Sequence, residues 1–224
     1  MGTSQKILTT ALWAMMALAM LSLVGTGMWA TRCGTTGSAP LVAVIPEKDA
    51  EHGLPVLFDL PALELVDQNN RPIRDAELKG HPFVGCFVFT HCAGPCPTMF
   101  LKLAEMQKGL IANGVKSVCF TVDPDRDTPE VLKAKAKDLK ADDANWSFIT
   151  GEKSKVDKLL RQMLQPRPGP GDNPLMHDTK FYLFDAQGQC RGRYSSNDED
   201  ALTALKRDAA TLGADARSHG GKAS

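Results

Sequence analysis

The chain has 224 residues, of which 26 are basic and 26 acidic, so its formal net charge at pH 7 is zero. This length is sufficient for one domain with its own hydrophobic core, so the six cysteines are not needed as structural staples. Lys and Arg form no basic block, which argues against a nucleic-acid-binding protein.

The N-terminal segment is predicted to be a membrane anchor. Residues 7–30 contain no charged side chain, and about 20 such residues span a bilayer. The run is longer than the apolar part of a cleaved signal peptide, and no clear Ala-x-Ala cleavage site follows it, so an uncleaved anchor is favoured over a cleaved signal. We therefore expect a single-pass anchor over residues 1–32 of a bacterial inner-membrane protein, with the remaining chain facing the periplasm or extracytoplasmic side.

The rest of the chain alternates between strand-like and helix-like segments. Residues 33–55 are rich in Gly and Pro and are predicted to be a flexible linker. Strands are then expected at 57–58, 62–66, 83–89, 115–122, 146–150, 180–184 and 189–194, with a hairpin turn at 67–72 on the edge of the domain. Helices are expected from 99 to 110, from 128 to 139, from 154 to 164 and from 198 to 212.

This order predicts an α/β sandwich around a central mixed sheet, in the thioredoxin-like arrangement, over residues 56–212. Residues 213–224 are predicted to be a disordered tail. Residues 83–89 are apolar throughout, as expected of a central strand that is buried on both faces. In such sheets the chemistry gathers at the carboxyl end of a central strand and at the amino end of the helix that follows.

Cys92 and Cys96 fall at that place in the predicted fold. Pro97 suits the first helical position, which makes Cys96 the expected cap and places both sulfurs near the positive end of the helix dipole. This environment favours thiolates, which both metal binding and disulfide exchange require. Three residues separate the cysteines, whereas thioredoxin-type exchange commonly uses two, so the pair suits a shared metal while remaining capable of forming a disulfide.

Two sulfurs in an open site favour a soft metal that is carried and handed on. Soft thiolates select Cu(I), zinc or iron–sulfur clusters, and an added imidazole also accommodates oxidised copper. A structural zinc site would need four closed ligands, and no second pair of ligands is present.

A third ligand is less clearly marked by the pattern. His91 is expected to point to the other side of the sheet, His81 lies at the far end of the same strand, and His52 and His219 lie in the linker and tail. His177 follows a Pro- and Gly-rich loop that can deliver a ligand to the cysteines, although a loop histidine is commonly only solvated.

Three stretches together resemble the Sco/SenC family of copper-binding, thioredoxin-like proteins. They are FTHCAGPCPT at 89–98, TVDPDRDTPE at 121–130 and HDTKFYLFD at 177–185, and the similarity covers about residues 56–212. The resemblance implies binding of Cu(I) and Cu(II) by Cys92, Cys96 and His177. It also implies copper delivery to, or thiol reduction at, the binuclear copper site of cytochrome c oxidase. A copper donor protein and the copper-site subunit, or another cuproprotein, are the implied partners.

One departure from the family pattern concerns the loop between the cysteines. The family usually has Cys-Pro-Asp-x-Cys, whereas this chain has Ala93, Gly94 and Pro95 between its two cysteines. The loop therefore lacks an acidic group beside the metal, which bears on redox tuning and on partner docking.

Other candidate residues have simpler interpretations. Asp123, Asp125 and Asp127 resemble the start of a calcium loop but lack its glycine and distal glutamate, so a strand-to-helix turn with a helix cap is favoured. Cys86 and Cys119 lie in apolar strands and are predicted core residues. Cys33 and Cys190 either pair in an oxidising compartment or stay reduced. For Met99 and Met176, packing in the core is favoured over supplementing the site.

Three functions compete for the cysteine pair. A copper metallochaperone is favoured, which need not be an enzyme. The same thiols at a helix amino terminus suit a membrane-anchored thiol-disulfide oxidoreductase acting on extracytoplasmic protein thiols. A thiol-dependent peroxidase is the third hypothesis.

Overall fold

The computed structural model describes residues 53–164 and 179–220. The predicted anchor, almost all of the linker, and the loop that carries His177 lie outside these residues. The described elements are β1 (Phe58–Asp59), β2 (Glu64–Asp67), β3 (Pro72–Arg74), α2 (Asp75–Leu78), β4 (Phe83–Val88), α3 (Cys96–Ala112), β5 (Lys116–Thr121), α4 (Pro129–Asp138), β6 (Trp146–Thr150), α5 (Lys153–Leu164), β7 (Lys180–Phe184), β8 (Gln189–Ser195) and α6 (Glu199–Gly220).

The described strands form one mixed sheet in the order β1-β8-β7-β4-β5-β6-β2-β3. β4 pairs with β5 in parallel and with β7 in antiparallel orientation, and β5 pairs with β6 in parallel. β2 and β3 form the predicted hairpin, and β3 is the strand at the sheet edge. The predicted mixed sheet is therefore confirmed, and β4 lies in its middle.

Side chains of β4 alternate between two hydrophobic cores, which explains why all six of its residues are buried. Cys86 and its neighbours two positions away, Val84 and Val88, face a core shared with α3, α4 and α6. Phe83 and Phe87 face a second core shared with α5. Because both faces of β4 are buried, its sequence is apolar throughout and does not alternate with polar residues.

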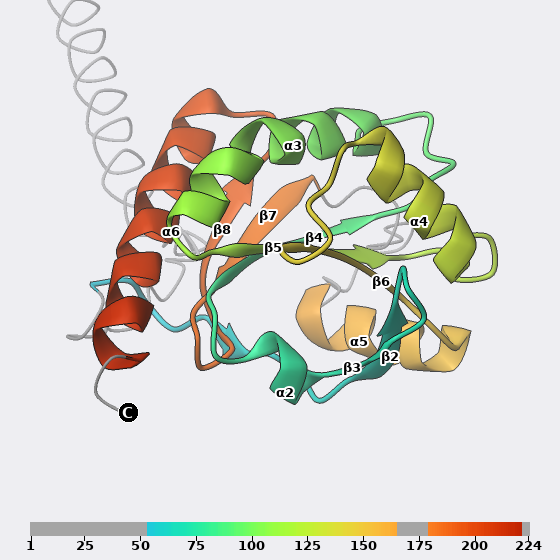
Figure 1. Ribbon diagram of the computed structural model, residues 1–224, viewed down its shortest axis with the longest axis horizontal. Helices are drawn as coiled ribbons and strands as arrows, with labels where there is room; N and C mark the ends of the chain where they lie inside the picture. Colours follow the sequence, from blue (N-terminus) through green and yellow to red (C-terminus); the bar gives the residue numbers. More distant parts are fainter. Residues whose placement is uncertain (1–52, 165–178, 221–224) are drawn as a thin grey trace, which may run out of the picture. The chain divides into compact units, whose positions relative to one another are not determined.

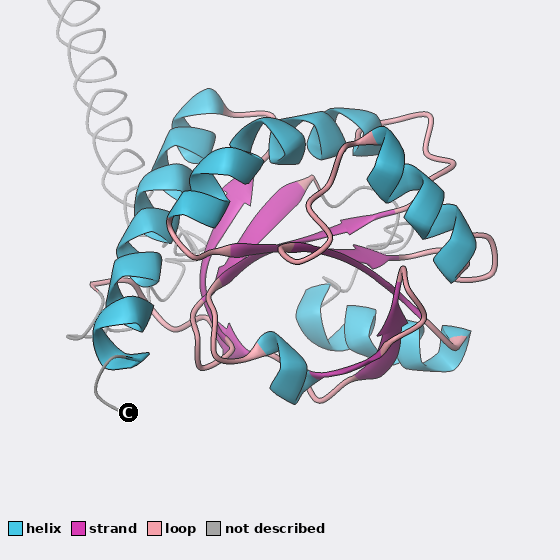
Figure 2. Ribbon diagram, in the orientation of Figure 1, coloured by secondary structure: helices cyan, strands magenta, loops and turns pink. Residues whose placement is uncertain are grey.

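Helices cover both faces of the sheet (Figure 1). α3, α4 and α6 lie on one face, while α5 and α2 lie on the other. The same layers, helix on sheet on helix, are visible when the ribbon is coloured by secondary structure (Figure 2). This three-layer arrangement agrees with the predicted α/β sandwich.

The end of α3 and the start of α4 follow the predicted signals. Thr128 is the N-cap of α4, where its side chain accepts a hydrogen bond from the Val131 amide, and Pro129 is the first helical residue. α3 ends at Asn113, and Gly114 follows with a φ of 71°, a conformation that glycine adopts readily.

Two predictions about the elements need correction. α6 continues beyond Leu212 to Gly220, so residues 213–220 are helical and not a disordered tail. Gly213 packs so closely that a Cβ atom would collide with the carbonyl oxygen of Asn113, and the Arg217 guanidinium donates a hydrogen bond to that same oxygen. This docking against the end of α3 orders a segment whose composition suggested disorder. The one-turn helix α2 was not predicted, because a single turn has no apolar periodicity.

Within residues 53–164 and 179–220, no helix combines the length and apolar character that crossing a bilayer requires.

Candidate functional site

The two cysteines of the motif lie where the central strand passes into α3. β4 ends at Val88, a loop follows, and Cys96 is the first residue of α3. Pro95 is the N-cap and Pro97 the second helical residue, so the helix begins one position earlier than predicted and Cys96 is not the cap. The predicted location of both residues, at the carboxyl end of the central strand and the amino end of a helix, is unchanged by this shift.

The environment of Cys92 favours its thiolate. Its side chain is half-buried, and the Gly94 amide donates a hydrogen bond to its Sγ at 3.3 Å. Burial opposes ionisation, but hydrogen bonds from the Cys96 amide, the Cys96 thiol and the Gly94 amide outweigh it and lower the pKa of Cys92. Cys92 is therefore the thiol prepared to act as a nucleophile or as a metal ligand.

Cys96 has the opposite character. It is 5% exposed and packs in the core beneath α3. Burial raises the pKa of Cys96 to about 12, and the neighbouring Cys92 sulfur adds to this rise. While Cys92 is ionised, Cys96 holds its proton and donates it in a hydrogen bond to the Cys92 sulfur. A metal or an oxidant that takes up both sulfurs must displace this proton.

The loop that carries Cys92 is fastened by Asp127, which is fully buried. The Asp127 carboxylate accepts hydrogen bonds from the Thr90 amide at 3.1 Å, from the Thr121 hydroxyl at 2.6 Å and from the Thr90 hydroxyl. One side chain thus connects the ends of β4 and β5 directly below the cysteine loop. The sequence interpretation placed Asp127 in a turn with a helix cap and missed this role.

The hydrogen bonds around Thr90 also assign the tautomer of His91. The Thr90 hydroxyl has one proton, which it donates to Asp127, so its 3.0 Å contact with His91 Nδ1 requires the imidazole N–H as donor. Neutral His91 therefore carries its proton on Nδ1, and its Nε2 has the lone pair. The side chain is exposed.

The described residues contain the two candidate sulfur ligands and no complete metal site. Within residues 53–164 and 179–220, no group of three or more His, Cys, Asp or Glu side chains could hold a metal ion. His177 and Met176 lie outside the described residues, as do His52 and Cys33. Met99 is 1% exposed and belongs to the core, which confirms core packing over a role at the site.

The remaining described cysteines are buried and reduced. Cys86 and Cys119 are core residues as predicted, and they are paired across β4 and β5 with their sulfurs 3.4 Å apart. The Trp146 indole N–H donates to the Cys119 sulfur at 3.3 Å. Cys190 is fully buried, and burial raises its pKa to about 12. These side chains pack the core and are remote from solvent.

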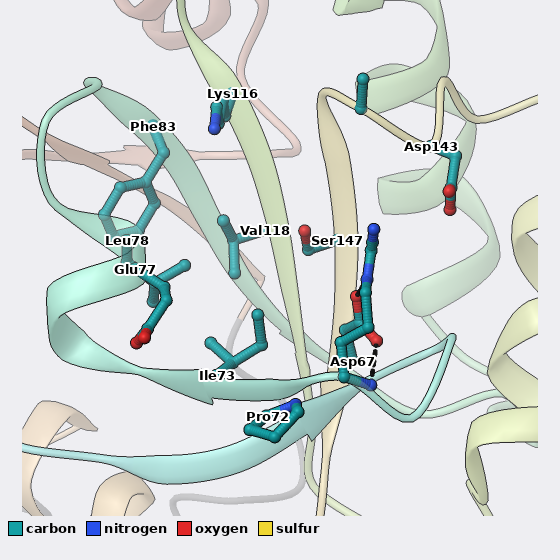
Figure 3. Close-up of a pocket in the computed structure, with 12 residues that line it drawn as sticks. Asp67, Pro72, Ile73, Glu77, Leu78, Phe83, Lys116, Val118, Asp143 and Ser147 are labelled. Atoms are coloured by element: carbon teal, nitrogen blue, oxygen red, sulfur yellow. Dashed lines mark hydrogen bonds and ion pairs between the residues drawn. The ribbon is translucent and has the colours of Figure 1, made fainter.

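A hollow of about 330 Å³ lies at the opposite end of the sheet from the cysteine loop. Ile73, Phe83 and Val118 turn into it from three different strands (Figure 3). Phe83 begins β4, whereas the cysteines follow its end, so this hollow is separate from the thiol pair. Its lining contains no cysteine or histidine.

Comparison with known proteins gives one consistent family. The family model SCO1/SenC matches residues 60–210. A SCO1/SenC family lipoprotein from Bacillus anthracis has 32% sequence identity and a TM-score of 0.61, covering 69% of this chain and 95% of its own. BsSco, described with a disulfide switch as a member of the Sco family of cytochrome c oxidase assembly proteins, has 26% identity and a TM-score of 0.58, covering 70% and 96%.

A copper-bound structure is also among the similar proteins. ScoI of Bradyrhizobium japonicum, solved with copper bound, has 26% identity and a TM-score of 0.53, covering 66% of this chain and 97% of its own. The similarity therefore extends over nearly the whole of each compared structure.

Proposed function

The chain belongs to the SCO1/SenC family, and from this premise we propose that it binds copper through Cys92, Cys96 and His177. The bound copper is cargo, delivered for assembly of the binuclear copper site of cytochrome c oxidase. The observation that carries the proposal is the pair of thiols at the start of α3, one of which favours its thiolate form.

The chemistry of the donor set fits copper. Two thiolates suit Cu(I), and an imidazole added to them also accommodates Cu(II). The copper-bound ScoI structure and the family membership support the same metal for this chain. Copper binding must release the Cys96 proton, so the affinity should rise with pH.

The topology supports His177 as the third ligand. β7 runs antiparallel beside β4, so the amino end of β7 and the carboxyl end of β4 lie at the same side of the sheet. Thr179, just before β7, is fixed by a 2.7 Å hydrogen bond from the Ser196 amide to its carbonyl oxygen. Thr179 therefore lies at the edge of the sheet where the cysteine loop begins, and two residues span at most about 7 Å, which supports His177 as the proposed ligand.

Copper titration of the full chain tests this assignment. The reduced protein should bind close to one copper per monomer, and the Cu(II) form should show a sulfur-to-copper charge-transfer band with nitrogen coupling in its electron paramagnetic resonance spectrum. His177→Ala should remove that nitrogen coupling and weaken Cu(II) binding by at least about tenfold.

Two further variants control the experiment. His81→Ala removes an exposed imidazole just before the start of β4 and should leave copper binding unchanged. Cys92→Ser removes a sulfur ligand and should abolish binding of both oxidation states. If His177→Ala binds Cu(II) as tightly as the parent, the ligand assignment is wrong.

A thiol-disulfide oxidoreductase acting on extracytoplasmic protein thiols is the second candidate function. The contrast between an ionisable Cys92 and a buried, protonated Cys96 favours it, because such a pair can attack a disulfide and then resolve the mixed disulfide. The disulfide switch described for BsSco supports the same reactivity. Turnover of a protein disulfide that survives His177→Ala would assign this function, and oxidation of the cysteine pair should abolish copper binding in either case.

We propose further that residues 7–30 anchor the protein in a bacterial inner membrane with residues 56–212 on the periplasmic side. The charge-free run supports this arrangement. Fusion of alkaline phosphatase after residue 220 should give active enzyme in the membrane fraction. An inactive fusion in the membrane would show that the chain has the opposite orientation. A fusion carrying two arginines within residues 14–22 is the control and should lose membrane insertion.

A further inference from the structure

A small hollow lies between α3 and α4, directly beside the cysteine loop. Its volume is about 210 Å³, and it is lined by Thr90, Pro97, Phe100, Leu101, Lys135 and Leu139. Thr90 precedes the loop and Pro97 follows Cys96, so the hollow borders both chain segments that hold the thiols. We call it the α3–α4 hollow.

An exposed apolar side chain stands at this hollow. Leu101 is 59% exposed. Among the described residues, the only other exposed large hydrophobic side chain is Ile111, at 36%. Single exposed apolar residues are ordinary on protein surfaces. Leu101 differs because it adjoins a concave apolar surface one helical turn from Cys96. An exposed apolar side chain beside an apolar hollow is a suitable contact surface for an apolar side chain of a partner protein.

The hollow also carries one positive charge. Lys135 is the only charged residue in its lining, and its Nζ lies 5.9 Å from the centre of the Phe100 ring. None of the ion pairs within residues 53–164 and 179–220 involves Lys135. A carboxylate is the complementary group, and neither the lining nor the Ala93-Gly94-Pro95 loop provides one.

We propose that the α3–α4 hollow is the docking site for a segment of the protein that receives copper from Cys92 and Cys96. That segment places one apolar side chain in the hollow, against Leu101 and Phe100, and a neighbouring Asp or Glu beside Lys135. The inference rests on the proposed function, since the receiving protein is defined by the metal transfer.

The dimensions and position of the hollow favour a protein segment as its occupant. Its volume corresponds to about seven water molecules, which is room for a single apolar side chain and not for a folded element. Cu(I) passes between proteins by exchange of thiolate ligands, so a receiver must contact the surface around Cys92. The α3–α4 hollow lies within that surface.

The test measures association of the copper-loaded full chain with a defined probe. The probe is the soluble copper-binding domain of the cytochrome c oxidase subunit from the same organism, and the readout is the dissociation constant from calorimetry. Leu101→Ser and Lys135→Glu should each weaken the complex by at least about fivefold. Added salt should weaken the parent complex more than the Lys135→Glu complex, because the lost contact is ionic.

Matched variants on the same two helices serve as controls. Ile111→Ser removes an exposed apolar side chain near the other end of α3, and Lys137→Glu reverses an exposed charge on α4. Both should leave the complex unchanged. All four variants should bind copper as the parent does, which separates docking from the metal site.

The outcomes distinguish the docking site from the function on which it rests. If Leu101→Ser and Lys135→Glu bind the probe as tightly as the parent does, the proposed docking site is wrong and the proposed metal site is unaffected. A parent chain that binds copper but not the probe overturns it as well. A parent chain that binds no copper overturns the proposed function itself. Concentration-dependent dimers of the parent that Leu101→Ser abolishes assign the hollow to a second copy of this chain instead.

Discussion

The thiols of Cys92 and Cys96 belong to one motif but have different surroundings. Cys92 is half-buried in its loop and receives a backbone amide hydrogen bond, whereas Cys96 is enclosed by the core at the start of α3. The pKa of Cys92 is lowered and that of Cys96 is raised to about 12. As the pH rises, Cys92 therefore ionises before Cys96.

Alkylation should reveal this difference. Iodoacetamide reacts with thiolates, so at pH 7 to 8 we expect it to modify Cys92 first and to leave Cys96 unmodified. The rate should rise with pH, with its midpoint below the ordinary thiol value, because the pKa of Cys92 is lowered. Peptide mass mapping across a pH series measures both the site and the rate.

The same experiment on two variants checks the assignment. In Cys92→Ser the fast reaction should disappear, and in Cys96→Ala its midpoint should move to higher pH, because Cys92 loses the hydrogen bond from the Cys96 thiol. Equal rates at both cysteines in the parent would contradict the proposed asymmetry.

At the scale of elements, Asp127 holds three of them in place. It accepts hydrogen bonds from residues at the ends of β4 and β5 and immediately precedes the N-cap of α4. A buried carboxylate is costly unless its oxygens are hydrogen-bonded, and these threonine contacts meet that requirement. The cysteine loop starts from Thr90 and so depends on this connection.

Asp127→Ala should lower the free energy of unfolding by about 1–3 kcal/mol, because it leaves the half-buried Thr90 amide and the buried Thr121 hydroxyl without an acceptor. Urea unfolding measures this loss. The matched control is Asp125→Ala in the same loop, where the carboxylate is 67% exposed and its 3.6 Å contact with Lys153 is weak. A loss for Asp127→Ala no larger than for Asp125→Ala would show that the buried connection is unimportant.

At the scale of the molecule, the sheet separates two hydrophobic cores. α3, which begins with Cys96, packs on one face, and α5 packs on the other through Leu160, Leu159 and Val156. The thiols are therefore supported mainly by the first core (Figure 1). Damage to the second core should affect stability more than thiol chemistry.

Leu160→Ala tests this separation. Leu160 is fully buried, so the truncation should cost about 2–5 kcal/mol of unfolding free energy, measured in urea. The pH profile of Cys92 alkylation, recorded under folded conditions, should match that of the parent. Arg161→Ala, at an exposed position of the same helix, is the control and should change neither quantity. A shifted alkylation profile in Leu160→Ala would show that the two cores are coupled.

The agreement between sequence and structure has a local origin. The apolar run of β4, the Thr128-Pro129 start of α4 and the Asn113-Gly114 end of α3 are signals that act within a few residues. The strand-helix order then restricts the topology to few arrangements. α6 shows the limit of this reasoning, because its last two turns depend on contacts with Asn113, far away in the chain.

The sequence by itself determined the mixed α/β fold, the spacing of Cys92 and Cys96, and their location after the central strand, because these depend on local patterns. Only the tertiary structure decided which thiol ionises, what Asp127 fastens, and that Leu101 and Lys135 share a hollow. Those properties arise from burial and from hydrogen bonds between residues distant in sequence. A linear pattern does not specify them, since they exist only after the sheet and its helices have packed.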